Sequence, residues 1–131
     1  MKYGKDKYTS DEVMNTTAAY GVTPFIRCLK GEFEGYDVPI LSTGLLIGRD
    51  ATACHLIFSD NSDVSRYHCR VTYSSKTGYF VVTDLNSTNG VYTENGQRIP
   101  MGDKLVLGPG QQFGLCGDEI VFLTVIKQNV E

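Results

Sequence analysis

The chain has 131 residues and carries 15 Asp and Glu against 12 Lys and Arg, which gives a net charge of −3 at pH 7. This length fits one domain, and hydrophobic residues, at 41% of the chain, can fill a single core. Because nucleic acids and anionic membranes favour basic surfaces, the acidic balance argues against both as main partners. No apolar run approaches the roughly 20 residues of a membrane span.

The first 21 residues differ from the rest of the chain. They are polar and have no sustained apolar period, although Thr9 and Glu12 stand at capping-box spacing ahead of a short stretch toward Tyr20. A helix that short is marginal by itself. We expect residues 1–21 to be a flexible or docked tail and residues 22–131 to be the domain. No apolar stretch follows the N-terminal residues, so a secretory signal is not expected and the cytoplasm is the expected location.

From residue 22 onward, short β-like runs alternate with turn residues. Run 68–73 places Cys69, Val71 and Tyr73 on one face, and run 119–127 is apolar on both faces, as in a covered central strand. Asn95-Gly96 predicts a hairpin with a type I′ turn, which needs positive φ at both positions. Short strands without a helical period predict an antiparallel β-sandwich or barrel. The predicted strands cover residues 23–30, 35–40, 44–49, 55–58, 68–73, 79–85, 91–93, 97–99, 104–107, 111–116 and 119–127.

Four cysteines stand far apart in the sequence, with no Cys-x-x-Cys pair among them. A structural zinc site usually takes its ligands in close pairs, so this spacing argues against zinc. Each cysteine lies in or beside an apolar run, which predicts small buried hydrophobic residues in a reducing compartment rather than disulfides. They are Cys28, Cys54, Cys69 and Cys116.

Three segments place polar side chains where predicted strands begin or end. They are residues 48–50 (GRD), 64–68 (VSRYH) and 84–90 (DLNSTNG). In a sandwich the loops gather at the ends of the sheets, and such loops commonly carry function. The segments supply guanidinium groups, hydroxyls and a side-chain amide, which together suit a doubly charged, tetrahedral oxyanion. Nothing in this set resembles a metal cage or a pair of proton-transfer groups, so neither a metal nor a cofactor is expected.

The ordered set Gly-Arg, Ser-x-x-His and Ser-x-Asn-Gly between residues 48 and 90 resembles the signature of the forkhead-associated (FHA) domain. The likeness extends from Val22 to Lys127. It implies an eleven-stranded antiparallel β-sandwich, which is also the number of predicted strands. It further implies a module without enzymatic activity that binds phosphothreonine in a partner protein or peptide, downstream of a Ser/Thr protein kinase.

The resemblance also implies roles for individual residues. Arg49 and Ser65 would bind the phosphate, and Arg66 falls where the family commonly has a polar or basic phosphate contact. Thr88 would support the phosphate or the peptide. Asn89 would hydrogen-bond the peptide backbone next to the phosphothreonine.

Three more residues would shape the loops: Gly48 and Gly90 through their backbones, and His68 as a buried structural residue. Asn86 stands where a glycine is common in the family, and Asn tolerates positive φ. Ser65 and His68 could also be taken for a nucleophile and its base. They lie three residues apart across a loop-to-strand step, so we do not expect them to face each other, and no Asp that would orient the histidine is evident.

Two alternative interpretations stay open from the sequence. In the first, a kinase phosphorylates the tail residues Thr16 or Thr17, which then occupy the domain's own pocket. Some small bacterial proteins of the family are arranged in this way, and the tail resembles theirs loosely. A tethered ligand competes at an effective concentration that can reach roughly the mM range. In the second interpretation, the sandwich has a structural or interaction role and its phosphate site is inactive.

Overall fold

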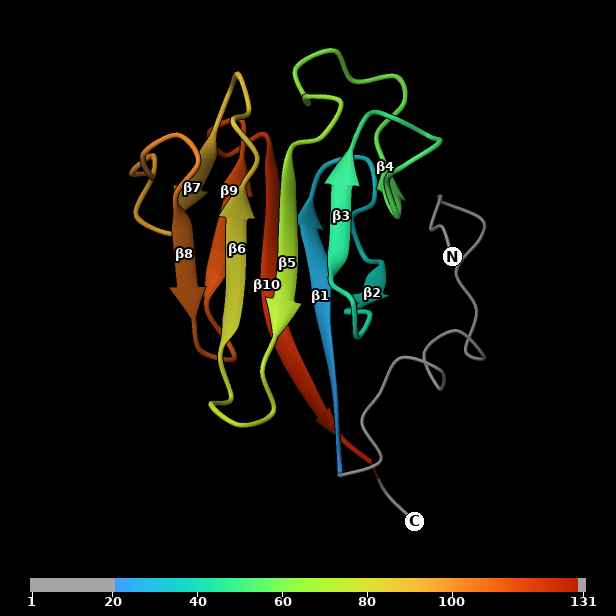
Figure 1. Ribbon diagram of the computed structural model, residues 1–131, viewed down its shortest axis with the longest axis vertical. Helices are drawn as coiled ribbons and strands as arrows, with labels where there is room; N and C mark the ends of the chain where they lie inside the picture. Colours follow the sequence, from blue (N-terminus) through green and yellow to red (C-terminus); the bar gives the residue numbers. More distant parts are fainter. Residues whose placement is uncertain (1–20, 130–131) are drawn as a thin grey trace.

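The structure is a computed structural model that describes residues 21–129, and its regular elements there are all β-strands. The predicted tail, apart from Gly21, lies outside these residues, so the boundary between tail and domain stays a prediction. In the described part of the chain no helix is long and apolar enough to cross a membrane. The strands are β1 (Val22–Lys30), β2 (Asp37–Pro39), β3 (Leu45–Gly48), β4 (Leu56–Ile57), β5 (Cys69–Tyr73), β6 (Phe80–Asp84), β7 (Val91–Thr93), β8 (Lys104–Leu107), β9 (Gln112–Leu115) and β10 (Ile120–Gln128) (Figure 1).

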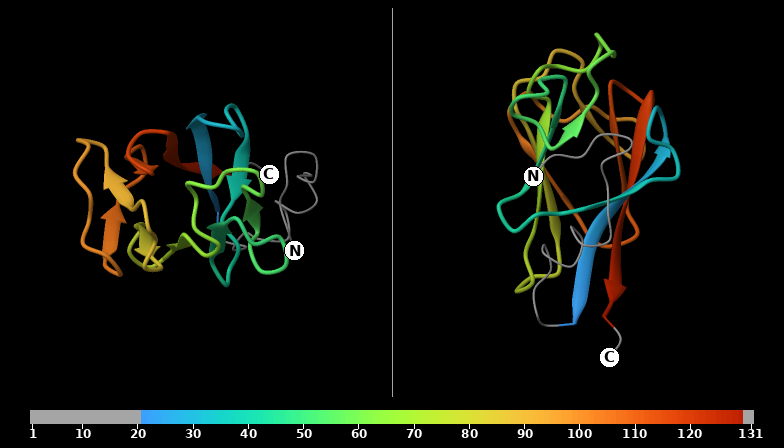
Figure 2. Two further views of the ribbon diagram at one scale, coloured as in Figure 1. Left: turned by 90° about the horizontal axis from the view of Figure 1, so that it is seen from above. Right: turned by 90° about the vertical axis from the view of Figure 1, so that its right-hand side faces the viewer.

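The ten strands form two five-stranded sheets that lie face to face as two layers (Figure 2). One sheet has the order β2-β1-β10-β9-β7, and the other has the order β4-β3-β5-β6-β8. Strand β10 is central in its sheet, as its apolar residues on both faces predict. This arrangement confirms the predicted all-β sandwich.

Two details of the sheets differ from the prediction. Strands β3 and β4 pair in parallel, with Ile47 opposite Leu56, so their sheet is mixed rather than purely antiparallel. Segment 97–99 forms only an isolated bridge between Arg98 and Tyr92, so residues 21–129 hold ten strands instead of eleven. The segment is too short to extend this pairing because the hairpin turn precedes it directly and Pro100, which has no amide hydrogen to donate, follows it.

The hairpin predicted at Asn95-Gly96 forms, but its turn is not of type I′. The amide of Gly96 donates to the carbonyl of Thr93 at 2.9 Å, and the amide of Thr93 donates to Gln97 at 2.8 Å. Gly96 has a φ of 84°, whereas Asn95 is not among the residues with positive φ. The turn therefore has positive φ at one position only, Gly96, whereas a type I′ turn needs positive φ at both central positions.

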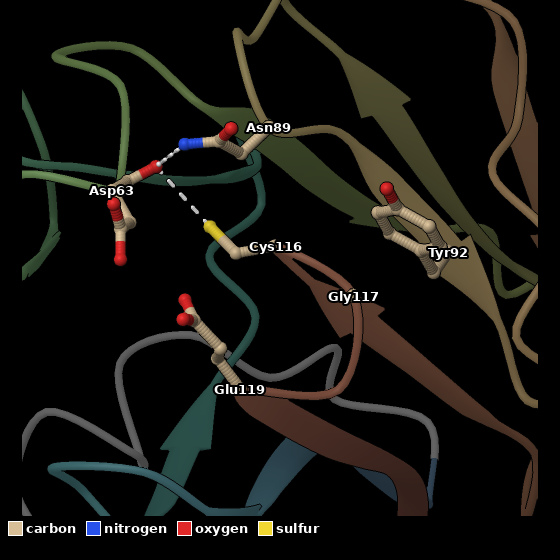
Figure 3. A pocket seen from close by; sticks show the side chains of 6 residues that line it. All are labelled: Asp63, Asn89, Tyr92, Cys116, Gly117 and Glu119. Atoms are coloured by element: carbon tan, nitrogen blue, oxygen red, sulfur yellow. Dashed lines mark hydrogen bonds between the residues drawn. The ribbon is translucent and has the colours of Figure 1, made fainter.

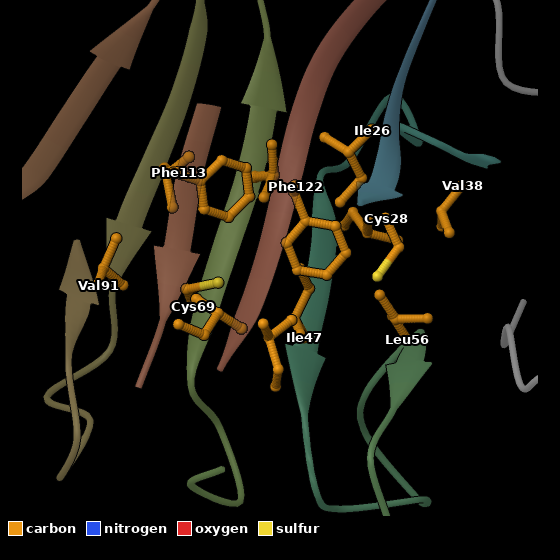
Figure 4. Packing of buried hydrophobic residues seen from close by; sticks show 14 of the residues in the cluster. Ile26, Cys28, Val38, Ile47, Leu56, Cys69, Val91, Phe113 and Phe122 are labelled. Carbon is orange, nitrogen blue, oxygen red and sulfur yellow. The ribbon is translucent and has the colours of Figure 1, made fainter. Parts of the chain in front are cut away.

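The core lies between the sheets and consists of inward-facing residues from both layers (Figure 4). On β5, Cys69 and Val71 are fully buried and Tyr73 packs against the same cluster, which confirms the predicted alternation. Phe113 of β9 and Phe122 of β10 pack with their ring centroids 5.2 Å apart. This continuous apolar layer holds the two sheets together and fixes the strand ends from which the loops emerge.

The cysteines carry thiols rather than disulfides. Cys28, Cys54 and Cys69 are buried, as predicted for small hydrophobic residues, whereas Cys116 is half-buried at the end of β9. Burial raises the pKa of the Cys116 thiol to about 11. At neutral pH this thiol is therefore protonated, which makes it a poor nucleophile.

Strand register brings the predicted functional segments to one end of the sandwich. Ile47 of β3 lies opposite Cys69 of β5, and Cys69 lies opposite Asp84 of β6, so these three residues form a row across the sheet. The segments that follow β3, precede β5 and follow β6 therefore leave the sheet side by side, at the top of Figure 1. The turn between β9 and β10 emerges at the same end.

Candidate functional site

Two of the predicted segments are joined through their backbones. The amide of Arg49 donates to the carbonyl of Ser65 at 3.0 Å, and the amide of Asp50 donates to the carbonyl of Arg66 at 3.2 Å. This pairing requires glycine at position 48, because a Cβ atom there would lie 2.2 Å from the carbonyl oxygen of Arg66. Gly48 therefore permits close contact between two backbones rather than an unusual φ value.

The Arg49 side chain is half-buried and held in one orientation. Its Nε atom donates to the carbonyl oxygen of Val64 at 2.8 Å. Within residues 21–129, no hydrogen bond or ion pair engages the two terminal nitrogens of this guanidinium. Because a guanidinium presents its donors in a rigid planar fork, one anchored edge leaves the other edge ready for a bidentate contact with an anion.

Ser65 and Thr88, which lie 23 positions apart in the sequence, meet at the site. The amide of Thr88 donates to Ser65 Oγ at 3.0 Å. Since this bond uses a lone pair of the oxygen, the hydroxyl hydrogen of Ser65 is left to donate to a ligand. Arg66 follows Ser65 in the same loop, and its side chain is exposed to solvent. The structure thus brings the segments of Arg49, Ser65 and Thr88 together.

Asn89 joins the third segment to the second. Its Nδ2 atom donates to the carbonyl oxygen of Asp63 at 2.8 Å (Figure 3). The thiol of Cys116 donates to the same oxygen at 3.2 Å, so three loops meet at this one acceptor. The Asn89 amide keeps its oxygen and one hydrogen for other partners, and this pair matches the donor and acceptor of a peptide backbone.

His68 lies beneath these loops and is fully buried. Its Nδ1 atom accepts from the amide of Ser65 at 3.1 Å, so the ring hydrogen is on Nε2, which lies 2.9 Å from the carbonyl oxygen of Gly90. The imidazole therefore braces the Ser65 loop against the Gly90 loop. Because both ring nitrogens bond to backbone groups, neither serves as a base for the Ser65 hydroxyl, and the pair is not a nucleophile with its base.

Burial lowers the pKa of His68 below its ordinary value of 6.5. The unfolded chain takes up a proton on this histidine near pH 6.5, whereas the folded protein does so only at lower pH. The free energy of unfolding should therefore fall as the pH drops below about 6.5. Urea unfolding at pH 7.5 and pH 5.5, with NMR titration of the ring protons, measures this effect. A folded-state pKa of His68 at or above 6.5 would contradict it.

Asp84, which has no predicted role from the sequence, organises the loop after β6. The Asp84 carboxylate is buried and accepts from the amide of Gly102 at 2.8 Å and from the amide and hydroxyl of Ser87. The Ser87 hydroxyl in turn accepts from the amide of Gly90 at 3.1 Å. These bonds satisfy loop amides that would otherwise be buried without partners. An Asp at the end of an apolar strand, three residues before a Ser, was the signal in the sequence.

Arg98 is a second residue whose role was not predicted from the sequence. Its Nη2 atom donates to the carbonyls of Ser87 and Thr88, each at 3.1 Å. Gly90, with a φ of 87°, leaves room for this guanidinium, because a Cβ atom there would lie 2.4 Å from Arg98 Nε. Arg98 therefore holds the loop that presents Thr88 and Asn89.

Asn86 adopts a φ of 58°, so the positive φ expected at this position is confirmed. Across the site, the hydroxyl of Tyr67 donates to the carboxylate of Asp50 at 3.0 Å. Hydrogen bonds from Thr52 and Tyr67 lower the pKa of Asp50 to about 2. This ionised carboxylate ties the loop after β3 to the loop before β5.

The chemistry of the assembled site is that of an anion receptor. It offers the free edge of one guanidinium, a second exposed guanidinium and a hydroxyl hydrogen, with an amide placed beside them. In residues 21–129, no cluster of three or more His, Cys, Asp or Glu is placed to hold a metal ion. Charge-assisted hydrogen bonds of this kind are roughly twice as strong as neutral ones, so an oxyanion is the ligand that the groups suit.

Comparisons with known proteins agree with this geometry. The family model of the FHA domain matches residues 45–116. No curated protein matches the chain significantly.

Similar solved structures include the FHA domain of CT664 from Chlamydia trachomatis, with 22% identity, a TM-score of 0.66, and coverage of 79% of this chain and 96% of that one. A structure from a study of phosphothreonine-dependent FHA domain interactions has 21% identity, a TM-score of 0.62, and coverage of 79% and 95%. Mycobacterium tuberculosis EmbR, in complex with a low-affinity phosphopeptide, has 23% identity and a TM-score of 0.66, and the match covers 92% of this chain and 29% of EmbR. Because the family model spans more than half of the sequence and the fold agrees, this chain belongs to the FHA domain family.

Proposed function

We propose that this protein binds phosphothreonine in partner proteins and so recruits them in Ser/Thr-kinase signalling, without catalysing a reaction. The observation that carries the proposal is the Arg49 guanidinium, which is anchored through Nε to Val64 and has its terminal nitrogens available, while the Arg49 backbone is bonded to that of Ser65. Recognition of a phosphorylated motif by a pocket that carries arginine is an established mode of peptide binding.

Two similar structures support this function. EmbR was solved with a phosphopeptide, and another of the structures comes from work on phosphothreonine-dependent FHA domain interactions. In our proposal, Arg49, Ser65 and Arg66 bind the phosphate, Thr88 supports it, and Asn89 pairs with the peptide backbone. His68, Gly48 and Gly90 hold the loops in place.

A degenerate peptide library tests the proposal, because it requires no particular partner sequence. The library carries a fixed phosphothreonine between degenerate flanks, and a matched library carries threonine instead. We expect the protein to retain peptides from the first library only, and the Arg49→Ala variant to retain neither. Equal retention of both libraries would contradict phosphate recognition.

Ser65→Ala should weaken a phosphothreonine peptide by about 1.5–3 kcal/mol, the range for a hydrogen bond to a charged group. The variant removes the hydroxyl hydrogen aimed at the phosphate and the acceptor of the Thr88 amide. Ser75→Ala, an exposed position in the β5–β6 turn, is the matched control and should leave affinity unchanged. Fluorescence polarisation with a labelled peptide measures both. An unchanged affinity of Ser65→Ala would remove Ser65 from the site.

The alternative in which a phosphorylated tail fills its own pocket has a geometric difficulty. Thr16 and Thr17 lie outside the described residues, but Thr17 is only four positions before Gly21, a span of at most about 14 Å. Gly21 is fixed at the far end of the sandwich, where its carbonyl accepts from the amide of Asn129. Nine residues of strand at about 3.3 Å each, close to 30 Å, separate Asn129 from the loop end of β10. The span from Gly21 to Thr17 is shorter than this distance, which argues against Thr17 entering the domain's own pocket while β1 stays paired.

The proposal also covers the classes of partner that are not expected and the location of the protein. Nucleic acid and membranes are not proposed as partners, since a net charge of −3 does not favour binding to polyanions. We also retain the cytoplasm as the proposed location, which suits cysteines that carry thiols.

A further inference from the structure

A groove leads away from Asn89 across the outer face of β7, β9 and β10. It consists of two adjoining pockets of about 250 Å³ each, which share Tyr92 and Gly117 in their linings. The inner pocket lies next to the proposed peptide site, and Figure 3 shows Asp63 and Glu119 directed into it from two different loops. The outer pocket continues past Tyr92 toward Glu94 and Asp118. We call the two pockets together the acidic groove.

A row of residues on the outer face of the sheet, with a glycine at its centre, lines the outer pocket. Tyr92, Gly114 and Val121 lie opposite one another on neighbouring strands, so they form one row across the outer face of the sheet. Gly114 contributes no side chain to this row, and a Cβ atom there would lie 2.4 Å from the carbonyl oxygen of Gly117. The carbonyl of Gly117 therefore covers Gly114, and the outer pocket lies beside it, lined by Tyr92, Gly117 and Val121.

The charge of the groove is opposite to that of the phosphate site. Each pocket is lined by two carboxylates and by no Lys or Arg: Asp63 and Glu119 in the inner pocket, Glu94 and Asp118 in the outer one. Lys30 approaches Asp118 at 3.7 Å, but the Asp118 side chain is 92% exposed, so this ion pair neutralises the groove only weakly. A ligand that spans both regions is expected to carry a phosphate at one end and cations at the other.

We propose that the acidic groove binds a flank of the phosphothreonine peptide that carries lysine or arginine. This inference rests on the proposed function, because the groove begins at Asn89, the residue assigned to the peptide backbone. The charges of such a peptide complement both regions of the surface. The aliphatic stems of the basic side chains would pack in the outer pocket against Tyr92 and Val121, and their cationic groups would lie near the Tyr92 ring and the four carboxylates.

The dimensions of the groove set the positions of the basic residues. Glu94 lies five positions after Asn89, with β7 between them, and at about 3.3 Å per position this is roughly 16 Å. An extended peptide covers the same distance in about five residues. The basic side chains should therefore lie within about five positions of the phosphothreonine, on one side of it.

The test uses synthetic peptides with one central phosphothreonine and five residues on each side. One peptide has neutral flanks, and others carry two lysines or two glutamates on either the N-terminal or the C-terminal side. Fluorescence polarisation at low and physiological salt measures their affinities. We expect lysines on one side to tighten binding about threefold each relative to the neutral peptide, and glutamates on that side to weaken it.

Variants of the protein locate the effect. Glu119→Gln removes a carboxylate of the inner pocket, and Glu94→Gln removes one of the outer pocket while it keeps an acceptor for the Gln112 amide. In each variant, the ratio of the affinities for the lysine peptide and the neutral peptide should shrink. Asp103→Asn also removes one negative charge, but from the start of β8 in the other sheet, and should leave the ratio at its wild-type value.

The outcomes separate this inference from the proposed function. If the neutral peptide binds only when phosphorylated but lysines on neither side tighten binding, the groove assignment is wrong and the proposed function stands. A lysine preference that survives in both groove variants would also overturn the assignment. If no peptide shows a dependence on phosphate, the proposed function fails and the inference fails with it.

Discussion

Arg49→Ala is expected to weaken the binding of a phosphothreonine peptide by about 2–4 kcal/mol, the loss typical of a dominant contact residue. This corresponds to a loss of roughly 30- to 1000-fold in affinity. The reason is that Arg49 presents the free edge of a guanidinium whose other edge is anchored to Val64, so the bidentate contact needs little reorganisation. Isothermal titration calorimetry on the folded variant measures the change.

Two further arginine variants make this expectation specific. Arg49→Lys keeps a positive charge but loses the planar fork, so it should recover only part of the affinity. Arg70→Ala is the matched control, because Arg70 lies on β5 with its guanidinium bonded to the carbonyl of Thr43, away from the site. If Arg49→Ala and Arg70→Ala lowered affinity equally, the effect would come from net charge and not from a phosphate contact.

Gly48→Ala is expected to lower the free energy of unfolding by about 2–4 kcal/mol, the upper range for forcing an extra group into a packed position. The added methyl group would lie 2.2 Å from the Arg66 carbonyl oxygen and 2.8 Å from Cys54 Sγ, so backbone must move. That carbonyl accepts from the Asp50 amide, and its displacement would break the link between the Arg49 and Ser65 loops. Urea denaturation measures the loss of stability.

Gly108→Ala is the control for this substitution. Gly108 does not have a positive φ, and the nearest atom to an added Cβ would be Gln111 Oε1 at 3.7 Å, an ordinary contact. Its stability should stay close to that of the wild type or rise slightly, because alanine restricts the unfolded chain. If Gly48→Ala proved as stable as Gly108→Ala, the close approach at Gly48 would not be a constraint on this fold.

The fold was largely predictable from the sequence because each strand is a local pattern. The alternation in β5 and the apolar faces of β10 identified a strand with one face toward the core and a central strand. The parallel pairing of β3 with β4 was not predictable, because it depends on where the loop after Arg49 returns rather than on composition. The absence of a strand at 97–99 also depends on context, since the turn and Pro100 confine that segment.

The residues of the candidate site also fall into those that could be proposed from the sequence and those that could not. Arg49, Ser65 and Asn89 could be proposed from the sequence because their residue types and order suit a phosphate ligand. The role of Arg98 could not, because it acts through bonds to the backbone of Ser87 and Thr88 that no local pattern records. The bonds of Asp84 to Ser87 follow a local Asp-x-x-Ser spacing, whereas its bond to Gly102 depends on the fold. The acidic groove likewise depends on strand register, which places Gly114 between Tyr92 and Val121.

The central claim is that the site recognises a phosphate on threonine. The most direct test is calorimetric titration of the full chain with the best phosphothreonine peptide from the library and with its unphosphorylated twin. We expect measurable affinity for the phosphorylated peptide and at least 100-fold weaker binding of its unphosphorylated twin, a difference of about 2.7 kcal/mol in binding free energy. The Arg49→Ala variant should lose this difference. Equal affinity of the wild-type protein for the two peptides would contradict the claim.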